Sequence, residues 1–296
     1  MFLKKLAIAF CLLLVPAGAN ASIVYSNDFS SPVVIGPSQA PGVWYPNSWY
    51  YPPSGFQTSG GRLIETISSA DSESNRPNGF QAPVRNVQGL RLDLPGGVIQ
   101  VTADLYIPAE WATTEQRMGG MAVSTYNGVG TLVQTPAIFV NSNTAGPYFE
   151  VWGGASFFNG GFFPGTAFDV THKLEIRLAD DEWQYFIDGM FLAGFDDLGS
   201  TQIGDVMLMG YNSYGPGETG TYDICWDNLV ARDAIDSGSG VRSSIGCVAD
   251  GGGDTGGGGG NGGVADVPEP GTMALFGAGI VGLGFMRRSR KAVRLS

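Results

Sequence analysis

The chain has a single histidine among its 296 residues, and this scarcity excludes much of the usual catalytic chemistry. No Ser-His-Asp or Cys-His arrangement and no multi-histidine metal site can be built from His172, which we interpret as a strand-edge residue without a special role. Basic residues are also few: 16 Lys and Arg stand against 27 Asp and Glu, for a net charge of −11. A chain this acidic lacks the positive surface that binds nucleic acid, so we expect no nucleic-acid partner.

Cysteine is nearly as rare, with three residues in the whole chain. Cys11 lies in the N-terminal apolar segment described next, which leaves Cys225 and Cys247. In an exported protein two such cysteines predict one disulfide, which would join the last strand to the segment that follows it. The alternative is a pair of unbonded thiols, because sequence alone does not show that the geometry permits a bridge.

Residues 1–21 have the three parts of a secretory signal peptide. Lys4 and Lys5 give a positive start, Leu6 to Val15 form an apolar core, and Ala19-Asn20-Ala21 is a small-residue cleavage pattern before Ser22. The apolar run is short for a membrane span, so we predict cleavage after Ala21, with an uncleaved anchor as the alternative.

Residues 22–235 have the composition of one globular domain, long enough to bury a core. The stretch "GVIQVTADLYIP" alternates, with Ile99, Val101, Ala103, Leu105 and Ile107 on one face. Similar strand candidates follow one another between Gly-, Pro- and Asn-rich turns, and only "AEWATTEQRM" is compatible with a short helical turn. No internal repeat of propeller length is present. The predicted fold is therefore all-β, an antiparallel β-sandwich of the jelly-roll kind.

The chain changes character after the domain. Residues 236–266 include a polyglycine tract and predict a disordered linker, because glycine loses much entropy on ordering and buries little. Residues 267–296 hold a short apolar stretch, Thr272 to Met286, followed by a basic cluster. This stretch predicts a short hydrophobic helix. Its basic tail would stay cytoplasmic, so we expect transient anchoring in the inner membrane.

The residues Pro268, Glu269 and Pro270, the apolar stretch and the terminal Arg cluster together resemble the PEP-CTERM sorting signal of Gram-negative bacteria. This resemblance implies that the tail is recognised by an exosortase, a membrane cysteine protease-transpeptidase, and cut near the Pro-Glu-Pro. It also implies that the protein ends at the cell surface or outside the cell.

The segment "HKLEIRLADDEWQYFIDGMFLAGF" and the later "YDICWDNLVAR" resemble the concanavalin A-like, laminin-G-like sandwich. In that fold a strand–Asp-Gly–strand hairpin precedes a closing strand. Some sandwich relatives are glucanases with Glu-x-Asp-x-x-Glu or Glu-x-Asp-x-Glu on one strand. This chain has no such spacing, so we predict that it is not an enzyme, with catalysis on scattered carboxylates as the alternative.

Calcium is the expected cofactor, if there is one, because such sandwiches hold Ca²⁺ with hard oxygen ligands in loops at one end. The candidate ligands are Asp196, Asp197, Asp223, Asp227 and Asn228. Alternatively, Asp227 and Asn228 end the closing strand and bond to local backbone.

Aromatic residues in "VWYPNSWYYPPSGF" are the candidates for sugar binding: Trp44, Trp49, Tyr50 and Tyr51. Exposed rings stack on sugars, and the phenylalanines of "SFFNGGFF" form a second candidate. The alternative, slightly favoured, is that these rings belong to the core. The sequence thus predicts an exported, non-catalytic surface or matrix protein that binds extracellular polysaccharide. The competing hypotheses are a polysaccharide hydrolase or lyase on the same fold and a purely structural surface protein.

Overall fold

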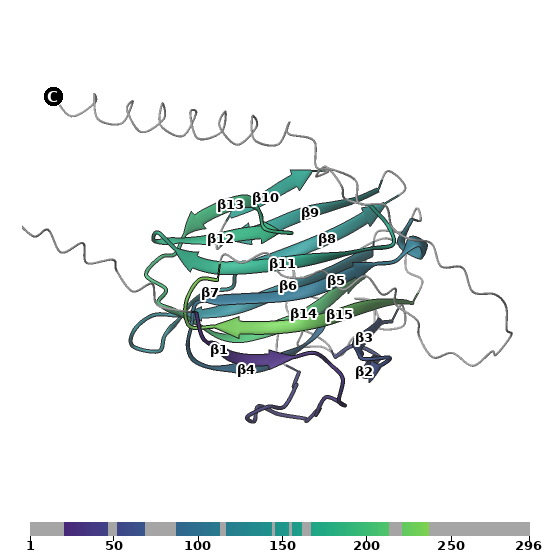
Figure 1. Cartoon of the computed structure of the whole chain (residues 1–296), viewed down its shortest axis with the longest axis horizontal. Coiled ribbons are helices and arrows are strands. Elements are labelled where there is room, and N and C mark those ends of the chain that lie inside the picture. Colours follow the sequence, from purple (N-terminus) through teal and green to yellow (C-terminus); the bar gives the residue numbers. More distant parts are fainter. Residues whose placement is uncertain are drawn as a thin grey trace, which may run out of the picture. The chain divides into compact units, whose positions relative to one another are not determined.

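The computed structural model describes residues 21–46, 52–68, 87–112, 117–143, 146–153, 156–161, 167–212 and 221–236 (Figure 1). The chain divides into two units, Met1–Gly251 and Gly252–Ser296, and every described residue belongs to the first. The predicted signal peptide up to residue 20, the linker beyond Asp236 and the sorting tail lie outside the described residues.

Strands make up almost all of the regular structure in the described part of the chain. One short 3-10 turn, η4 (Ala109–Trp111), falls at the start of the stretch predicted to be a helical turn. The strands are β1 (Ile23–Asn27), β2 (Gly55–Ser59), β3 (Arg62–Ile67), β4 (Val87–Val98), β5 (Gln100–Ile107), β6 (Arg117–Tyr126), β7 (Leu132–Gln134), β8 (Ala137–Asn143), β9 (Gly146–Gly153), β10 (Ser156–Gly161), β11 (Val170–Ala179), β12 (Glu182–Ile187), β13 (Met190–Asp196), β14 (Gln202–Asn212) and β15 (Tyr222–Arg232).

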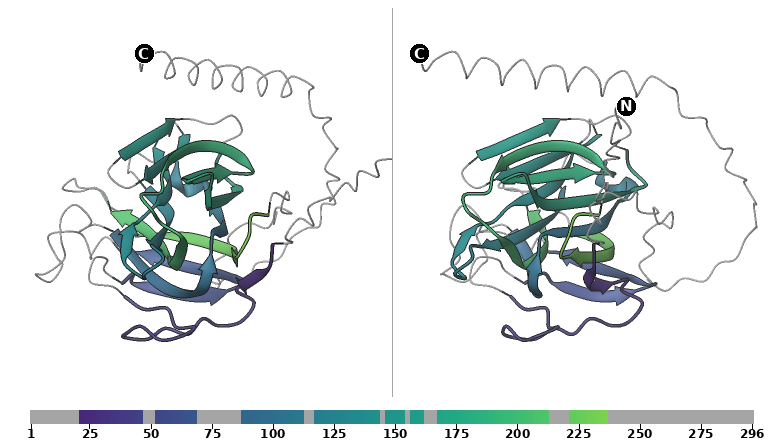
Figure 2. Two further views of the ribbon diagram at one scale, coloured as in Figure 1. Left: turned by 90° about the vertical axis from the view of Figure 1, so that its left-hand side faces the viewer. Right: turned by 60° about the vertical axis from the view of Figure 1, so that its left-hand side comes forward.

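These strands form two layers that pack face to face (Figures 1 and 2). The first sheet has the order β13-β12-β11-β5-β15-β3-β2, with β1 beside β15. The second sheet has the order β10-β9-β8-β6-β14-β4, with β7 beside β6. The pairings between these strands are antiparallel, which confirms the predicted antiparallel sandwich.

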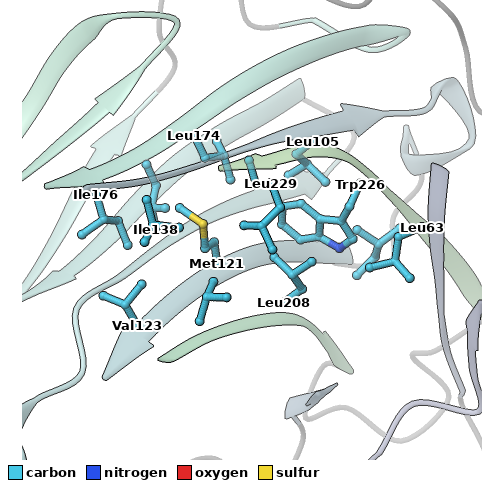
Figure 3. Close-up of a cluster of buried hydrophobic side chains, with 14 of the residues drawn as sticks. Leu63, Leu105, Met121, Val123, Ile138, Leu174, Ile176, Leu208, Trp226 and Leu229 are labelled. Carbon is cyan, nitrogen blue, oxygen red and sulfur yellow. The ribbon is translucent and has the colours of Figure 1, made fainter. Parts of the chain in front are cut away.

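The core lies between the two sheets and is formed by the alternate side chains of each strand that point inward (Figure 3). On β5, Val101, Ala103, Leu105 and Ile107 are fully buried, as the alternating pattern predicts, whereas Ile99 precedes β5 and is only partly buried. Trp226 of β15 lies among aliphatic side chains from both layers. Each fully buried aliphatic or aromatic side chain of this kind stabilises the fold by about 1.5–3 kcal/mol.

The hairpin from β12 to β13 turns at Asp188 and Gly189, as the Asp-Gly pair predicts. Both residues have positive φ angles, 51° and 79°, the conformation that a two-residue hairpin turn with matching twist requires. The turn also contacts the single histidine of the chain, His172 of β11. Asp188 lies 2.8 Å from Nδ1 of His172 through its Oδ2 atom, and the imidazole packs edge-on against Phe149 in the core.

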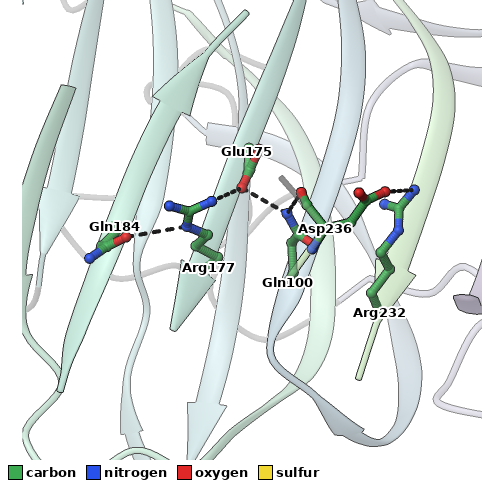
Figure 4. Close-up of polar contacts among 6 residues, drawn as sticks. All are labelled: Gln100, Glu175, Arg177, Gln184, Arg232 and Asp236. Carbon is green, nitrogen blue, oxygen red and sulfur yellow. Dashed lines mark hydrogen bonds and ion pairs between the residues drawn. The ribbon is translucent and has the colours of Figure 1, made fainter. Parts of the chain in front are cut away.

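The first sheet carries a row of paired polar side chains away from the core (Figure 4). Arg177 donates to Gln184 and lies 3.4 Å from Glu175, which in turn accepts from Gln100 at 2.8 Å. Gln100 also bonds to the backbone of Asp236. This row of contacts joins β12, β11 and β5 and reaches the end of the domain at Asp236.

Candidate ligand-binding face

The outer face of the second sheet carries its own small apolar cluster, separate from the core. On β6, Met121 and Val123 belong to the core, so the intervening Ala122 points to the opposite side. The cluster is formed by Val87, Ala122, Ala137, Met207 and Met209, with Phe139 and Tyr211 packed against it. We call the side chains on this side of β4, β14, β6, β8 and β9 the outer face.

The register of the strands shows which residues are neighbours on the outer face. One row runs from Arg91 of β4 through Met207, Ala122 and Ala137 to Trp152 of β9. It crosses four gaps between strands, and at about 4.8 Å for each gap its ends are about 19 Å apart. Polar residues gather near both ends of this row, around Trp152 on β9 and around Arg91 on β4. The outer face therefore carries two separate clusters of polar residues.

The first group lies on β8 and β9 around Trp152. The indole is 37% exposed, and Glu150 is two residues away on the same side of β9. Asn141 of β8 donates its side-chain amide to Glu150 at 2.5 Å. Burial raises the pKa of the Glu150 carboxyl, and the hydrogen bond from Asn141 opposes this shift. An open indole beside a carboxylate and an amide offers a stacking surface together with polar groups for hydroxyls.

The backbone under this group is fixed from the core side. The Tyr185 hydroxyl of β12 donates to the carbonyl of Trp152 at 2.6 Å, and Tyr185 is fully buried. This bond connects the two sheets and holds β9 in place. The indole of Trp152 is therefore presented by a rigid strand, which reduces the entropy lost on binding.

The second group lies on β4, β14 and the segment before residue 46. Asp93 and Asp205 are directly opposite each other on neighbouring strands. Asp93 accepts from the Tyr45 hydroxyl and from the Gln39 amide, each at 2.6 Å. Asp205 is nearly buried and lies 3.3 Å from Nε of Arg91.

Burial raises the pKa of the Asp205 carboxyl, and the nearby Arg91 guanidinium opposes this shift. Directly opposed side chains have Cβ atoms about 4.5–5.5 Å apart in an antiparallel pair. The carboxyl groups of Asp93 and Asp205 therefore extend from neighbouring Cβ atoms. Asp93 and Asp205 are thus neighbouring carboxylates, and Asp205 is buried beside the Arg91 guanidinium.

The predicted aromatic site has a different role where the structure describes it. Trp44 is 1% exposed and packs in the core, 5.1 Å from the ring of Phe56, so its prediction as a sugar-stacking residue was wrong. The segment around Trp44 adds to the edge of β4, and this pairing turns the indole inward. Trp49, Tyr50 and Tyr51 lie outside the described residues, as do Phe162 and Phe163, and the side chains of Phe157 and Phe158 are not described.

The five predicted calcium ligands lie at separate places. Asp196 and Asp197 accept from the backbone N–H groups of Leu198 and Gly199 within their own loop. Asp223, at the start of β15, accepts from Thr66. Within the described ranges no group of three or more His, Cys, Asp or Glu residues is arranged to hold a metal ion.

The last two candidates, Asp227 and Asn228, lie in a bulge of β15. Asp227 accepts from the Asn228 backbone, and the Asn228 amide donates to Asp104 of β5. The bond from the Asn228 backbone to Asp227 is local, as the alternative stated above predicts, but the two residues lie within β15 rather than at its end, and the bond to Asp104 joins two strands. Calcium binding stays a prediction.

Cys225 is buried on β15 and is disulfide-bonded. Its predicted partner, Cys247, lies outside the described residues.

Sequence reasoning missed both polar groups of the outer face. The alternation of "YFEVWGG" places Glu150 and Trp152 on one side of a strand, and this signal was available. The carboxylate pair had no such signal. Asp93 and Asp205 come from distant parts of the chain and meet only because β14 pairs with β4.

The two antiparallel sheets form a β-sandwich, and solved structures of jelly-roll sandwich proteins are similar to it. An endo-β-galactosidase from Clostridium perfringens that releases GlcNAcα1-4Gal matches with a TM-score of 0.48 and 11% identity, over 72% of this chain and 63% of that one. A laminarinase catalytic domain from Thermotoga petrophila matches with 0.45 and 11%, over 73% and 99%. A lichenase from a mouse hindgut metagenome matches with 0.44 and 13%, over 71% and 99%. The chain spans less than two thirds of the length of the galactosidase.

These matched structures are glycoside hydrolases, and they contradict the prediction that the chain is not an enzyme. That prediction is withdrawn. It rested on the missing carboxylate motif within one strand, whereas carboxylates on two neighbouring strands can also form a pair. At these identities the likeness shows the fold, so any activity has to be argued from the residues of this chain.

The tail of the chain carries the PEP-CTERM protein-sorting motif, which matches residues 266–291. The chain is accordingly an exported protein with a signal for exosortase processing. Comparison with curated protein sequences finds no match. In the described part of the chain no helix has the length and apolar character needed to cross a membrane.

Proposed function

We propose that this protein binds an extracellular polysaccharide through the outer face of the second sheet. One observation carries this proposal: the exposed indole of Trp152 lies on a rigid strand beside the Glu150–Asn141 pair. Exposed aromatic rings next to hydrogen-bonding side chains favour sugars, because the ring covers the C–H face and the polar groups bond hydroxyls.

The charge of the protein narrows the class of polysaccharide. The chain carries a net charge of −11, and Glu150, Asp93 and Asp205 are all on the outer face. A polyanion would be repelled by this surface. The expected ligand is therefore a neutral polysaccharide or one with amino groups.

Sorting and ligand binding fit together in this proposal. The inner membrane holds the tail transiently, an exosortase processes it, and the sandwich then works at the cell surface or in the extracellular matrix. The sandwich would hold polysaccharide there. The sorting motif supports the export step, and Trp152 supports the binding step.

The test is a binding assay with the full exported chain on a panel of neutral, amino-containing and acidic polysaccharides. Trp152→Ala should weaken binding about tenfold or more, as expected for the loss of a stacking ring. The matched control is Phe191→Ala, because Phe191 is 53% exposed but lies on the first sheet. Binding that is absent from the whole panel, or equally weakened by both variants, would refute the proposal and favour a purely structural surface protein.

A second candidate function is hydrolysis of a glycosidic bond at the Asp93–Asp205 pair. It is favoured by the direct opposition of the two residues and by the raised pKa of Asp205, which suits a proton donor. Glu150 is too far away to act on the same bond, because three gaps between strands, about 14 Å in all, separate β14 from β9. Release of reducing ends by the wild type, and its loss in Asp93→Asn and Asp205→Asn but not in Trp152→Phe, would establish this activity.

A further inference from the structure

Both ends of the described sandwich are held at the same place, near the end of β15. Ser22, just before β1, donates its backbone N–H to Oδ1 of Asp233 at 2.8 Å. The backbone N–H of Asp233 in turn donates to the carbonyl of Ser22 at 3.3 Å. Ser22 and Asp233 therefore bond to each other in both directions and extend the pairing of β1 with β15.

Ser22 is also the first residue after the predicted cleavage pattern Ala19-Asn20-Ala21. Cleavage there adds water across the Ala21–Ser22 peptide bond. Ala21 leaves as a carboxylate, and the Ser22 nitrogen becomes an α-ammonium group at neutral pH. That nitrogen is the atom that already lies 2.8 Å from the Asp233 carboxylate.

We propose that cleavage by a signal endopeptidase creates an ion pair between the new α-ammonium group of Ser22 and Asp233, and that this pair fastens β1 to β15 in the mature protein. A neutral amide donor is replaced by a charged one, and charge-assisted bonds are about twice as strong as neutral ones. Removal of the signal peptide thus strengthens the contact that holds β1 against β15.

The other charged groups nearby leave Asp233 available for this role. Arg232, whose backbone pairs with Ile23, directs its guanidinium to Asp236 at 3.2 Å. Asp236 is itself bonded through its backbone to Gln100. Asp236 is therefore held by Arg232 and Gln100 (Figure 4), and Asp233 is held separately by Ser22.

The test uses the full chain, exported and processed in a host, as wild type, Asp233→Asn and Asp233→Glu. Asp180→Asn is the control, because Asp180 is an exposed turn aspartate of the same sheet. Mass spectrometry of the N-terminal peptide identifies the first residue. Competitive acylation near neutral pH then measures the reactivity of its amine, and thermal unfolding confirms that each variant is folded.

We expect Ser22 as the first residue and an amine that reacts about threefold more slowly in the wild type than in Asp233→Asn, because an exposed ion partner raises the pKa of an amine by about half a unit. Asp233→Glu should restore slow acylation, and urea should abolish the difference. A different first residue, or equal rates in wild type and Asp233→Asn, would overturn the proposal.

Discussion

The indole N–H of Trp226 donates to Oε2 of Glu65 at 3.2 Å inside the core of the sandwich. Glu65 lies on β3 between Leu63 and Ile67, which both point into the core, and it is fully buried. Its other oxygen, Oε1, is buried without a hydrogen-bond partner. Burial raises the pKa of Glu65 from its ordinary value of 4.5 to about 8, so this carboxyl is mainly protonated in the folded protein at neutral pH.

The first prediction is a loss of stability as pH rises through this range. Between pH 4.5 and about 8 the folded state binds a proton that the unfolded state has released, so the free energy of unfolding falls by up to about 1.4 kcal/mol per pH unit. The contribution is fully present below pH 4.5 and lost above pH 8. Chemical denaturation at several pH values measures this slope.

Glu65→Gln should reduce that slope, because glutamine keeps the shape and does not titrate. The slope will not vanish, since burial also raises the pKa values of Asp104, Glu150 and Asp205, which act in the same direction. Glu182→Gln, at an exposed position on β12, is the control and should leave the slope unchanged. An identical slope in wild type and Glu65→Gln would show that Glu65 ionises normally.

Glu65 also shows which part of the structure could be predicted from the sequence and which could not. The alternation on β5 and the Asp-Gly turn are local patterns, and both are confirmed. The alternation of β3 places Glu65 on the same side as Leu63 and Ile67, whereas the charge of a carboxylate favours solvent, so the pattern and the residue type disagree. Its burial depends on Trp226, which is far away in the sequence but lies on the neighbouring strand β15 and supplies the hydrogen bond.

The outer face illustrates the same limit. Trp44 was a candidate for sugar stacking in a Pro-rich loop, with burial in the core as the slightly favoured alternative, and pairing with the edge of β4 places it in the core. Trp152 had no loop signal and is exposed on a strand. Exposure of an aromatic residue is set by which strand lies beside it, and this register is a property of the whole sheet.

The second prediction concerns packing between the sheets at Gly210 of β14. A Cβ atom at this position would overlap side-chain atoms of Ile67 and Ile224. Gly210→Ala should destabilise the protein by about 1–3 kcal/mol, since a close-packed core has no room for another carbon. Thermal unfolding measures the loss.

Gly128→Ala is the matched control, because nothing lies within 4 Å of the added atom. Ile67→Val in the Gly210→Ala background should recover part of the loss by removing a methyl group. Equal melting temperatures for wild type and Gly210→Ala would contradict the packing described for this position.

The third prediction concerns the disulfide of Cys225. Digestion without reduction should release a peptide that joins Cys225 to Cys247, the pairing that the sequence predicts. A bridge between these positions closes a loop of moderate length, so reduction should cost about 2–4 kcal/mol of stability. Cys225→Ala and Cys247→Ala should each show the same loss and be insensitive to reductant. Free thiols in the folded, non-reduced protein would refute the prediction.

The fourth prediction concerns the two hydrogen bonds between the Gln100 side chain and the backbone of Asp236. The Gln100 side chain accepts from the backbone N–H of Asp236 at 2.8 Å and donates to its carbonyl at 3.1 Å, as a neighbouring strand would. Gln100→Leu removes both bonds, together with the bond to Glu175, and keeps the approximate size of the side chain. Amide hydrogens at the end of the domain should then exchange about tenfold faster, because about 1–1.5 kcal/mol of local protection is lost.

Gln184→Leu provides the control for this experiment, since Gln184 lies at the other end of the same polar row and bonds only to Arg177 in the described contacts. It should leave exchange at Asp236 unchanged. If Gln100→Leu also leaves it unchanged, the Arg232–Asp236 pair alone holds this end, and Arg232→Gln should then release it. The comparison therefore decides which of two contacts fixes the point where the chain leaves the sandwich.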